Sequence, residues 1–311
     1  MRKLVALAFL ATITTVVAIP AAAKPPGANG KIVTSVEGDA QVYTVDPDGT
    51  NQQVVAINGE PGQWSPDGTL ISLFDRLLNP DDGSIIDLNL SAQYPDLFLP
   101  CGVWSPDGAR LACEGGFIDP SLQGVYTVRS SDGGDLQRVT SDPGGDDCPS
   151  DYSPNGKRLV FSRADATTYA LYTVKLDGSG LQQITPPGMN FNFCNGSWSP
   201  QGNEILFSAH VPDSAYASTI WVVHSDGSGL RQIPIPACGG LFSSSTFIGC
   251  GGAPSWSPDG TKIVFSRLVG ATGQRDLYTV NADGSGLFQV THTPDVAEDY
   301  AGDWGTHPLT K

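Results

Sequence analysis

One short phrase recurs along the chain and constrains the fold more than any other feature. An aromatic residue is followed by Ser-Pro, then by Asp, Asn or Gln, and then by Gly, with the aromatic at Trp64, Trp104, Tyr152, Trp198 and Trp256. A degenerate sixth copy, Asp303-Trp304-Gly305, lies near the C-terminus. The aromatic residues follow one another in steps of 40, 48, 46, 58 and 48 residues. This period suits one four-stranded blade of a β-propeller.

Each repeat contains the same succession of turns and strands. Ser-Pro-Asp-Gly suits a type I turn, because Pro fixes φ at the second position and Gly takes the fourth. Two nearly continuous β-branched and aromatic runs follow, such as residues 262–267 and 276–280, and runs of this kind are typical of strands covered on both faces. An Asp-Gly turn and an edge strand end the unit, as at residues 283–286 and 287–291.

The two ends of the chain complement each other. The first unit begins at Lys31 with the second strand of a blade, and the last unit supplies only the strand of Trp304. Together they make one complete blade, which closes the ring and removes an open sheet edge. The sequence therefore predicts an all-β, six-bladed β-propeller over residues 31–305, between a linker at 24–30 and a C-terminal tail at 306–311.

The repeated motifs resemble those of a known family. The Trp-Ser-Pro-Asp-Gly turn, the Ile/Leu-x-Phe-Ser strand and the Leu-Tyr-x-Val ending before Asp-Gly-Ser-Gly are similar to the WD-like propeller repeat of the TolB family, over residues 31–305. The resemblance implies a six-bladed propeller. TolB itself is periplasmic and carries an α/β domain before its propeller, which we expect this chain to lack. The same repeat accompanies serine peptidases and oligogalacturonate lyases, so the resemblance implies no single function.

The first residues indicate export. Arg2 and Lys3 precede an apolar stretch at residues 4–19, and Ala21-Ala22-Ala23 suits a cleavage site. The apolar stretch is shorter than the roughly 20 residues that span a bilayer. We therefore expect a signal peptide at residues 1–23 and a secreted or periplasmic protein without membrane insertion.

Six cysteines follow the leader, and an even number in an exported chain favours disulfides. No Cys-x2-Cys spacing supports a zinc site. Cys101 and Cys113 are symmetric about Asp107, at the centre of a turn. Cys148 and Cys194 each lie four residues before the aromatic marker of their blade, and the two blades are adjacent. Cys238 and Cys250 bracket one Gly/Ser-rich connection. Six cysteines allow 15 pairings, of which we predict Cys101–Cys113, Cys148–Cys194 and Cys238–Cys250.

The charge of the chain limits its partners. The chain has 32 acidic residues and 17 Lys and Arg, which give a net charge of −15. A chain with this charge is unsuited to binding nucleic acid. Of the acidic residues, 27 are Asp, and nine Asp-Gly pairs assign a third of these to turns. The surplus lies in connections that enter the innermost strands, where Asp147 and Asp299 both precede their aromatic marker by five residues. The predicted ligand contacts at the channel rim are Asp147, Asp151, Asp299 and Asp303.

Two kinds of rim ligand remain open. Carboxylates at a channel mouth suit a basic peptide or Ca²⁺, which prefers oxygen ligands, and Asp147 and Asp299 are the candidate calcium ligands. No Gly-x-Ser-x-Gly occurs and only four His are scattered along the chain. We therefore expect a monomeric, non-catalytic propeller that binds a protein, peptide or other ligand at the channel mouth. The alternative is an envelope or secreted polysaccharide lyase or hydrolase with a channel-mouth metal.

Overall fold

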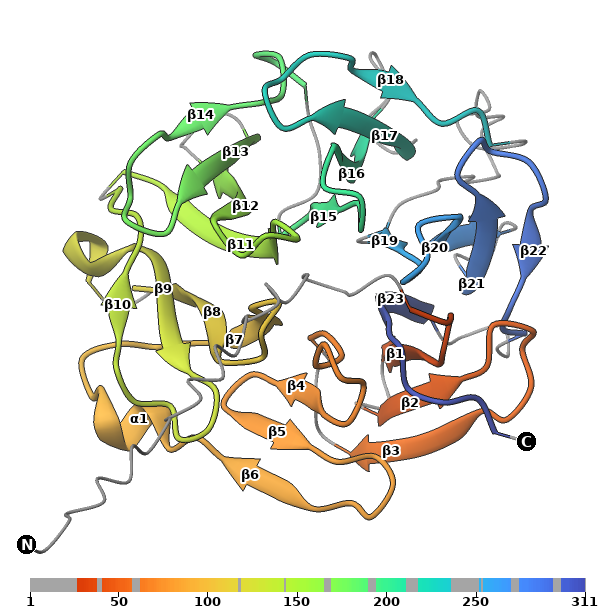
Figure 1. Cartoon of the computed structure of the whole chain (residues 1–311), viewed down its shortest axis with the longest axis horizontal. Helices are drawn as coiled ribbons and strands as arrows, with labels where there is room; N and C mark the ends of the chain where they lie inside the picture. Colours follow the sequence, from red (N-terminus) through yellow and green to blue (C-terminus); the bar gives the residue numbers. More distant parts are fainter. Residues whose placement is uncertain are drawn as a thin grey trace, which may run out of the picture.

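The computed structural model describes residues 27–310 apart from 38–40, 58–61, 117–118, 143, 165–168, 190–193, 211–217, 236–251, 253, 270–273 and 293–297. The signal peptide predicted at residues 1–23 and the predicted Cys238–Cys250 pair lie outside the described residues. In the described part, 23 strands form six blades around a ring, with one helix, α1 (Leu90–Gln93), and one 3-10 turn, η1 (Pro120–Leu122) (Figure 1). The prediction of an all-β, six-bladed propeller is confirmed.

Four blades follow the predicted plan, with strands antiparallel and in chain order from the centre outwards. Blade 3 contains β7 (Cys101–Trp104), β8 (Arg110–Gly115), β9 (Gly124–Arg129) and β10 (Gln137–Arg138). Blade 4 contains β11 (Asp146–Tyr152), β12 (Arg158–Ala164), β13 (Tyr169–Lys175) and β14 (Gln182–Gln183). Blade 5 contains β15 (Ser197–Trp198), β16 (Glu204–His210), β17 (Ser218–His224) and β18 (Arg231–Gln232). Blade 6 contains β19 (Ser255–Trp256), β20 (Lys262–Val269), β21 (Gln274–Asn281) and β22 (Phe288–Gln289).

Blade 2 is smaller than the others. Its innermost segment pairs through a single bridge, Trp64 with Ile71. Its three strands, β4 (Ile71–Leu73), β5 (Arg76–Leu78) and β6 (Ile85–Asp87), have only three residues each. All three residues of the edge strand β6 are exposed. Blade 2 therefore offers less strand surface to its neighbours than a blade of the usual length does.

Blade 1 closes the ring by joining the two ends of the described chain. The last strand, β23 (Glu298–Trp304), pairs with β1 (Ile32–Glu37), which continues into β2 (Gln41–Val45) and β3 (Gln53–Ile57). Beyond β23, the backbone carbonyl of His307 accepts a hydrogen bond from the N–H of Lys31 at 3.0 Å. The His307 ring stacks on Trp64 of blade 2, with the ring centroids 4.8 Å apart. The predicted closure is confirmed, and the C-terminal residues extend it to blade 2.

The repeated turns have the geometry that their sequence predicts. In blade 2, the N–H of Gly68 donates to the carbonyl of Ser65 at 2.8 Å. Gly68 has a φ of +73°, which Gly adopts without a steric penalty. The carboxylate of Asp67 accepts hydrogen bonds from the Ser65 hydroxyl and from the N–H of Thr69. The Asp-Gly-Ser-Gly turns make matching bonds, such as the N–H of Ser179 to Asp177.

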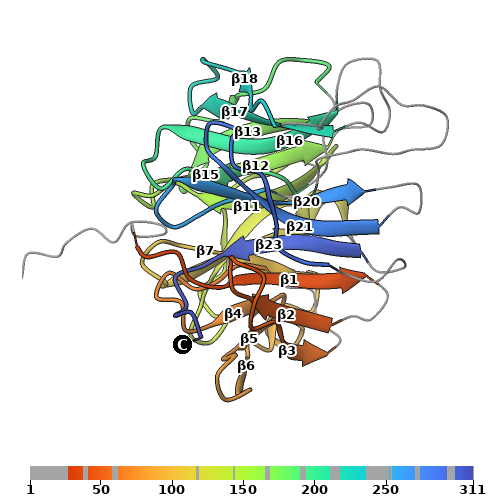
Figure 2. The ribbon, with the colours of Figure 1, turned by 90° about the vertical axis from the view of Figure 1, so that its right-hand side faces the viewer.

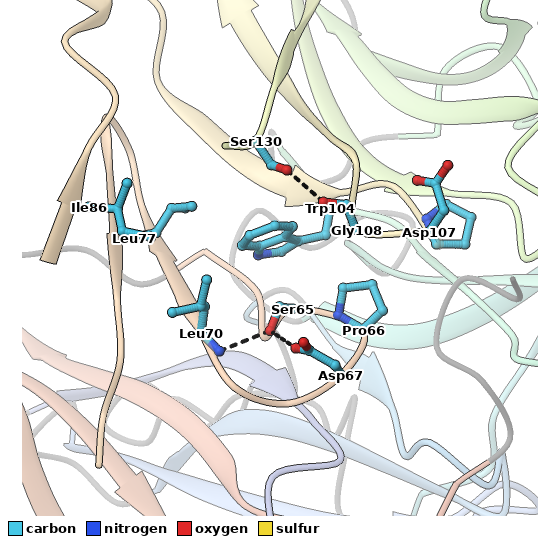
Figure 3. Close-up of a pocket in the computed structure, with 11 residues that line it drawn as sticks. Ser65, Pro66, Asp67, Leu70, Leu77, Ile86, Trp104, Asp107, Gly108 and Ser130 are labelled. Carbon is cyan, nitrogen blue, oxygen red and sulfur yellow. Dashed lines mark hydrogen bonds between the residues drawn. The ribbon is translucent and has the colours of Figure 1, made fainter. Parts of the chain in front are cut away.

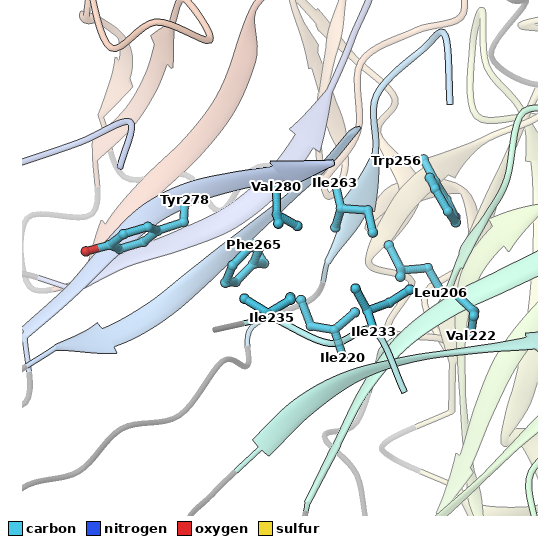
Figure 4. Close-up of a cluster of buried hydrophobic side chains, with 10 residues drawn as sticks. All are labelled: Leu206, Ile220, Val222, Ile233, Ile235, Trp256, Ile263, Phe265, Tyr278 and Val280. Carbon is cyan, nitrogen blue, oxygen red and sulfur yellow. The ribbon is translucent and has the colours of Figure 1, made fainter. Parts of the chain in front are cut away.

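The cores lie between blades, because each blade presents its apolar side chains to both neighbours. In Figure 4, Ile220 and Ile233 of blade 5 pack against Trp256 and Phe265 of blade 6. Burial of one large apolar side chain contributes about 1.5–3 kcal/mol. The aromatic markers thus act as interblade packing residues.

Two of the predicted disulfides, Cys101–Cys113 and Cys148–Cys194, are present, with Cα atoms 4.0 and 5.1 Å apart. The first joins two neighbouring strands of blade 3, and the second joins the innermost strand of blade 4 to the segment that leads into the innermost strand of blade 5. Among the described residues, no helix has the length and apolar character that a membrane crossing requires.

Candidate functional site

The two faces of the ring carry different parts of the repeat. β23 runs towards the face that holds the Ser-Pro-Asp-Gly turns and the C-terminus, on the left of Figure 2, which we call the turn face. β1 and β20 run towards the opposite face, which we call the loop face. The carboxylates predicted at the channel rim lie on β11 and β23, the innermost strands of blades 4 and 1.

Asp147 is buried at the loop end of β11. Arg163 on β12 donates from Nε to Oδ1 at 2.6 Å and from Nη2 to Oδ2 at 2.7 Å, and the Thr140 hydroxyl donates to Oδ2 at 2.5 Å. Nη1 of Arg163 also lies 3.2 Å from the Asp142 carboxylate. Burial lowers the pKa of Arg163, but the hydrogen bonds and the charge of Asp147 raise this pKa by a larger amount. The guanidinium therefore stays charged. Both oxygens of Asp147 are therefore already engaged within the protein.

Asp151 and Asp303 connect neighbouring blades. The carboxylate of Asp151 in blade 4 accepts a hydrogen bond from the backbone N–H of Trp198 in blade 5 at 2.7 Å. The carboxylate of Asp303 in blade 1 accepts one from the N–H of Trp64 in blade 2 at 3.1 Å, and another from the Ser255 hydroxyl of blade 6 at 2.7 Å. Both Asp side chains are buried. Each is one residue before an aromatic marker and bonds to the next marker.

The same bond recurs at two further interfaces with neutral acceptors. The N–H of Trp104 donates to Oε1 of Gln63 at 3.3 Å, and the N–H of Trp256 donates to the Ser197 hydroxyl at 3.4 Å. At the interface of blades 3 and 4 the equivalent residue is Val103, whose side chain cannot accept a hydrogen bond. We call Gln63, Asp151, Ser197 and Asp303 the interblade acceptors. The sequence signal was a polar residue immediately before the marker.

Asp299 takes the place in blade 1 that Asp147 takes in blade 4. It pairs with Val36 of β1, as Asp147 pairs with Arg163 of β12. Its side chain lies outside the described residues, so its part in ligand binding stays a prediction.

A carboxylate that sequence reasoning missed lies beside Asp147. Glu114 on β8 is largely buried where blade 3 faces blade 4, with Oε2 3.9 Å from Sγ of Cys194. A disulfide sulfur carries no proton, so this contact is not a hydrogen bond. Oε1 of Glu114 is buried and has no hydrogen-bond partner among the described residues. Burial, and then the negative charges of Asp146 and Asp147, raise the pKa of Glu114 to about 7.

Negative charge is in excess around Glu114. We define the Glu114 cluster as four carboxylates and one guanidinium: Glu114, Asp142, Asp146, Asp147 and Arg163. The Asp146 carboxylate accepts a hydrogen bond from the neutral amide of Gln123 at 2.7 Å. In the described part of the chain, Arg163 is the one basic side chain in an ion pair with these carboxylates. The cluster can therefore accept a further positive group.

The described residues do not assemble a metal centre at this place. Glu114 lies within 4.8 Å of Cys148 and Cys194, the one group of three potential ligands in the described part. Both sulfurs are joined in a disulfide and cannot bind a metal as thiolates. Of these three residues only the Glu114 carboxylate can bind a metal, and one ligand is too few for a dedicated Ca²⁺ or Zn²⁺ site.

Comparisons with known proteins agree with this architecture. No family model matches the chain. An uncharacterized protein of Agrobacterium fabrum is 26% identical over 220 residues, which cover 65% of this chain and 68% of that protein. TolB from Acinetobacter baumannii superposes with a TM-score of 0.69 and 17% identity, over 90% of this chain and 67% of TolB. The chain is a TolB-like six-bladed β-propeller. A structure from Agrobacterium tumefaciens, also described as a TolB, gives a TM-score of 0.62 and 20% identity over 90% and 93% of the two chains.

Other solved propellers share the fold with lower identity. A chain of the nidogen/laminin complex gives a TM-score of 0.64 with 8% identity, over 89% of this chain and 99% of that one. An oligogalacturonate lyase in complex with manganese gives 0.52 with 12% identity, over 82% and 71%. At such identities the likeness establishes the fold alone. The lyase shows that enzymes also use this ring.

Proposed function

We propose that this protein is an exported binding propeller that recognises a positively charged segment of a protein or peptide at the Glu114 cluster on its loop face. Export is supported by the leader sequence and by two disulfides in the described residues, which are typical of oxidising compartments. Recognition is supported by the fold, because a propeller presents variable loops on a rigid ring.

One observation carries this proposal. A buried carboxylate oxygen without a hydrogen-bond donor destabilises the folded state unless a partner satisfies it. Oε1 of Glu114 is such an atom among the described residues. An Arg or Lys side chain of a ligand supplies the missing positive charge, and it can donate to Oε1 once the half-buried Glu114 side chain turns towards it. The cluster therefore favours a cationic group over a neutral one.

Calcium at Asp147 is less favourable in this geometry. A Ca²⁺ ion would have to displace the donors of Arg163 and Thr140, which occupy both carboxylate oxygens of Asp147. The predicted site at Asp147 and Asp299 is tested by titrating Ca²⁺ into chelator-treated protein. If the titration produced no heat and left the melting temperature unchanged, the calcium hypothesis would be wrong.

A tetra-arginine peptide is a suitable probe for the Glu114 cluster. Titration calorimetry of the mature protein at low salt should show binding that weakens as salt screens the charges. Glu114→Gln should weaken it about tenfold, the equivalent of one charge-assisted hydrogen bond. Glu204→Gln is the matched control, because Glu204 begins β16 at its turn-face end, in an ion pair with Arg231.

The pH dependence gives a second readout. Since the pKa of Glu114 is raised to about 7, the ionised fraction of Glu114 rises roughly tenfold between pH 6 and pH 8, and the affinity for the peptide should rise with it. Glu114→Gln should remove this increase. If Glu204→Gln weakened binding as much as Glu114→Gln did, the peptide would be attracted by net charge alone, and the proposed site would be wrong.

A further inference from the structure

A separate cavity opens on the turn face, between blades 2 and 3. Its volume is about 450 Å³, within the range of pockets that hold small organic ligands. Figure 3 shows the Trp104 indole at its centre, between Leu70 of blade 2 and Ser130 of blade 3. Leu77 and Ile86 line the blade 2 wall. The cavity thus combines an aromatic ring with branched aliphatic walls.

The cavity exists because blade 2 is short and its turn stands apart from that of blade 3. A methyl group built on Gly108 would lie 4.0 Å from Pro66 of the preceding turn. The equivalent distances are 3.1 Å from Gly156 to Pro106 and 3.5 Å from Gly202 to Pro154, so those turns pack more closely.

The blade 2 wall is also incompletely covered. Ile86 of the three-residue strand β6 is 42% exposed. The step from Trp64 to Trp104 is the shortest of the repeat, at 40 residues. The side chains of this short blade 2 therefore leave part of its interface with blade 3 unfilled.

Two carboxylates border this apolar space. Asp67 and Asp107 take the same position in the turns of blades 2 and 3, and both line the cavity. Partial burial raises the pKa of each, but hydrogen bonds from residues of their own turns lower it more, so both are ionised at neutral pH. Neither forms an ion pair with a described basic residue, although the positive charge of Arg110 also lowers the pKa of Asp107. Their negative charges are therefore available to a ligand.

We propose that this cavity is a second binding site, whose ligand is a small organic cation with an apolar body, such as an aromatic or branched aliphatic amine. The walls take up the apolar body, and the carboxylates of Asp67 and Asp107 attract the ammonium group. A Trp ring adds to the preference for cations. The site is separate from the Glu114 cluster, which lies on the opposite face.

The test compares two probes of similar shape and opposite charge, phenethylammonium and 3-phenylpropionate. Titration should follow the indole N–H resonance of Trp104 in the mature protein. At low salt the cation should bind at least tenfold more tightly than the anion. Absence of binding by the cation, or equal binding of both probes, would overturn the proposal.

Variants separate the cavity from the general charge of the protein. Asp67→Asn combined with Asp107→Asn should abolish the preference for the cation. These turns should still form, because Asn155 already takes the same position in blade 4. Asp259→Asn, in the turn of blade 6, removes an equivalent carboxylate away from the cavity and should change nothing. If it reduced cation binding as much as the Asp67 and Asp107 changes did, the cavity would not be the site.

Two further variants complete the design. Ile86→Arg places a cation of the protein's own at the cavity wall and should block the probe. Glu114→Gln should leave phenethylammonium binding unchanged, so failure of the loop-face proposal and failure of this one can be told apart. Phenethylammonium binding that survived Ile86→Arg would contradict the assigned location.

Discussion

The carboxylate of Asp303 joins three blades, so its removal measures what the interblade acceptors contribute. It accepts hydrogen bonds from the N–H of Trp64 and the hydroxyl of Ser255, at 3.1 and 2.7 Å. Asp303 is 1% exposed, so bulk water does not replace a lost acceptor. Asp303→Ala leaves one buried N–H and one buried hydroxyl without this acceptor, at about 1–3 kcal/mol each. We expect a loss of about 4 kcal/mol in the free energy of unfolding.

The expected change in melting temperature follows from chain length. An unfolding entropy of about 2.1 cal/mol/K per residue amounts to roughly 0.65 kcal/mol/K for 311 residues. A loss of about 4 kcal/mol then lowers the melting temperature by about 6 °C, which scanning calorimetry resolves. Asp303→Asn is the control, because its amide oxygen can accept from Trp64 while its NH₂ donates to Ser255. We expect a decrease below about 2 °C for this variant.

Two results would refute this reasoning. If Asp303→Ala melted within 1 °C of the wild type, the bonds between blades would contribute nothing net to stability. If Asp303→Asn were as damaging as Asp303→Ala, the negative charge would matter more than the two hydrogen bonds.

Three further changes test other parts of the structure. Arg163→Met leaves the buried carboxylate of Asp147 without its cation and should cost about 3–5 kcal/mol in urea unfolding, much of which a second change, Asp147→Asn, should restore. His307→Ala removes the ring stacked on Trp64 and should cost about 1–2 kcal/mol by calorimetry. Burial raises the pKa of folded Glu114 from 4.5 to about 7, so the folded chain retains a proton that the unfolded chain releases between these values. The wild type should therefore lose stability relative to Glu114→Gln as pH rises from 4.5 to 7, and melting curves across this range check the sign.

The repeat was sufficient to predict the blades, because each motif determines a local structure. Pro and Gly specify the turn, and the apolar runs on either side of it can only be buried between neighbouring blades. Symmetry about the turn centre at Asp107 also located the Cys101–Cys113 pair. These inferences needed no knowledge of distant contacts.

The same symmetry applied to blade 4 would have placed Asp147 opposite Arg163, since both lie eight residues from Asn155. The spacing of the aspartates from their aromatic markers, which predicts the rim sites, carries no information about this cross-strand partner. The interblade acceptors were harder to recognise, because their donors are backbone N–H groups of the next blade. These donors belong to the aromatic markers, but a backbone N–H is present whatever the side chain, so the markers themselves do not reveal the bond. Glu114 was missed because its burial depends on how blades 3 and 4 pack together.

The structure separates the acidic residues of this chain by the hydrogen bonds that they accept. In eight of the Asp-Gly turns, hydrogen bonds from nearby residues lower the pKa of the Asp. Where the turn is partly buried, burial raises this pKa but by a smaller amount. The eight residues are Asp48, Asp67, Asp82, Asp107, Asp177, Asp226, Asp259 and Asp283. These carboxylates stabilise turns above their ordinary pKa of 3.8 and lose that effect as pH falls below it. Asp147, Asp151 and Asp303 likewise serve the fold. A ligand is therefore best sought where a carboxylate lacks a donor, as at Glu114, or borders an unfilled apolar space, as beside Trp104.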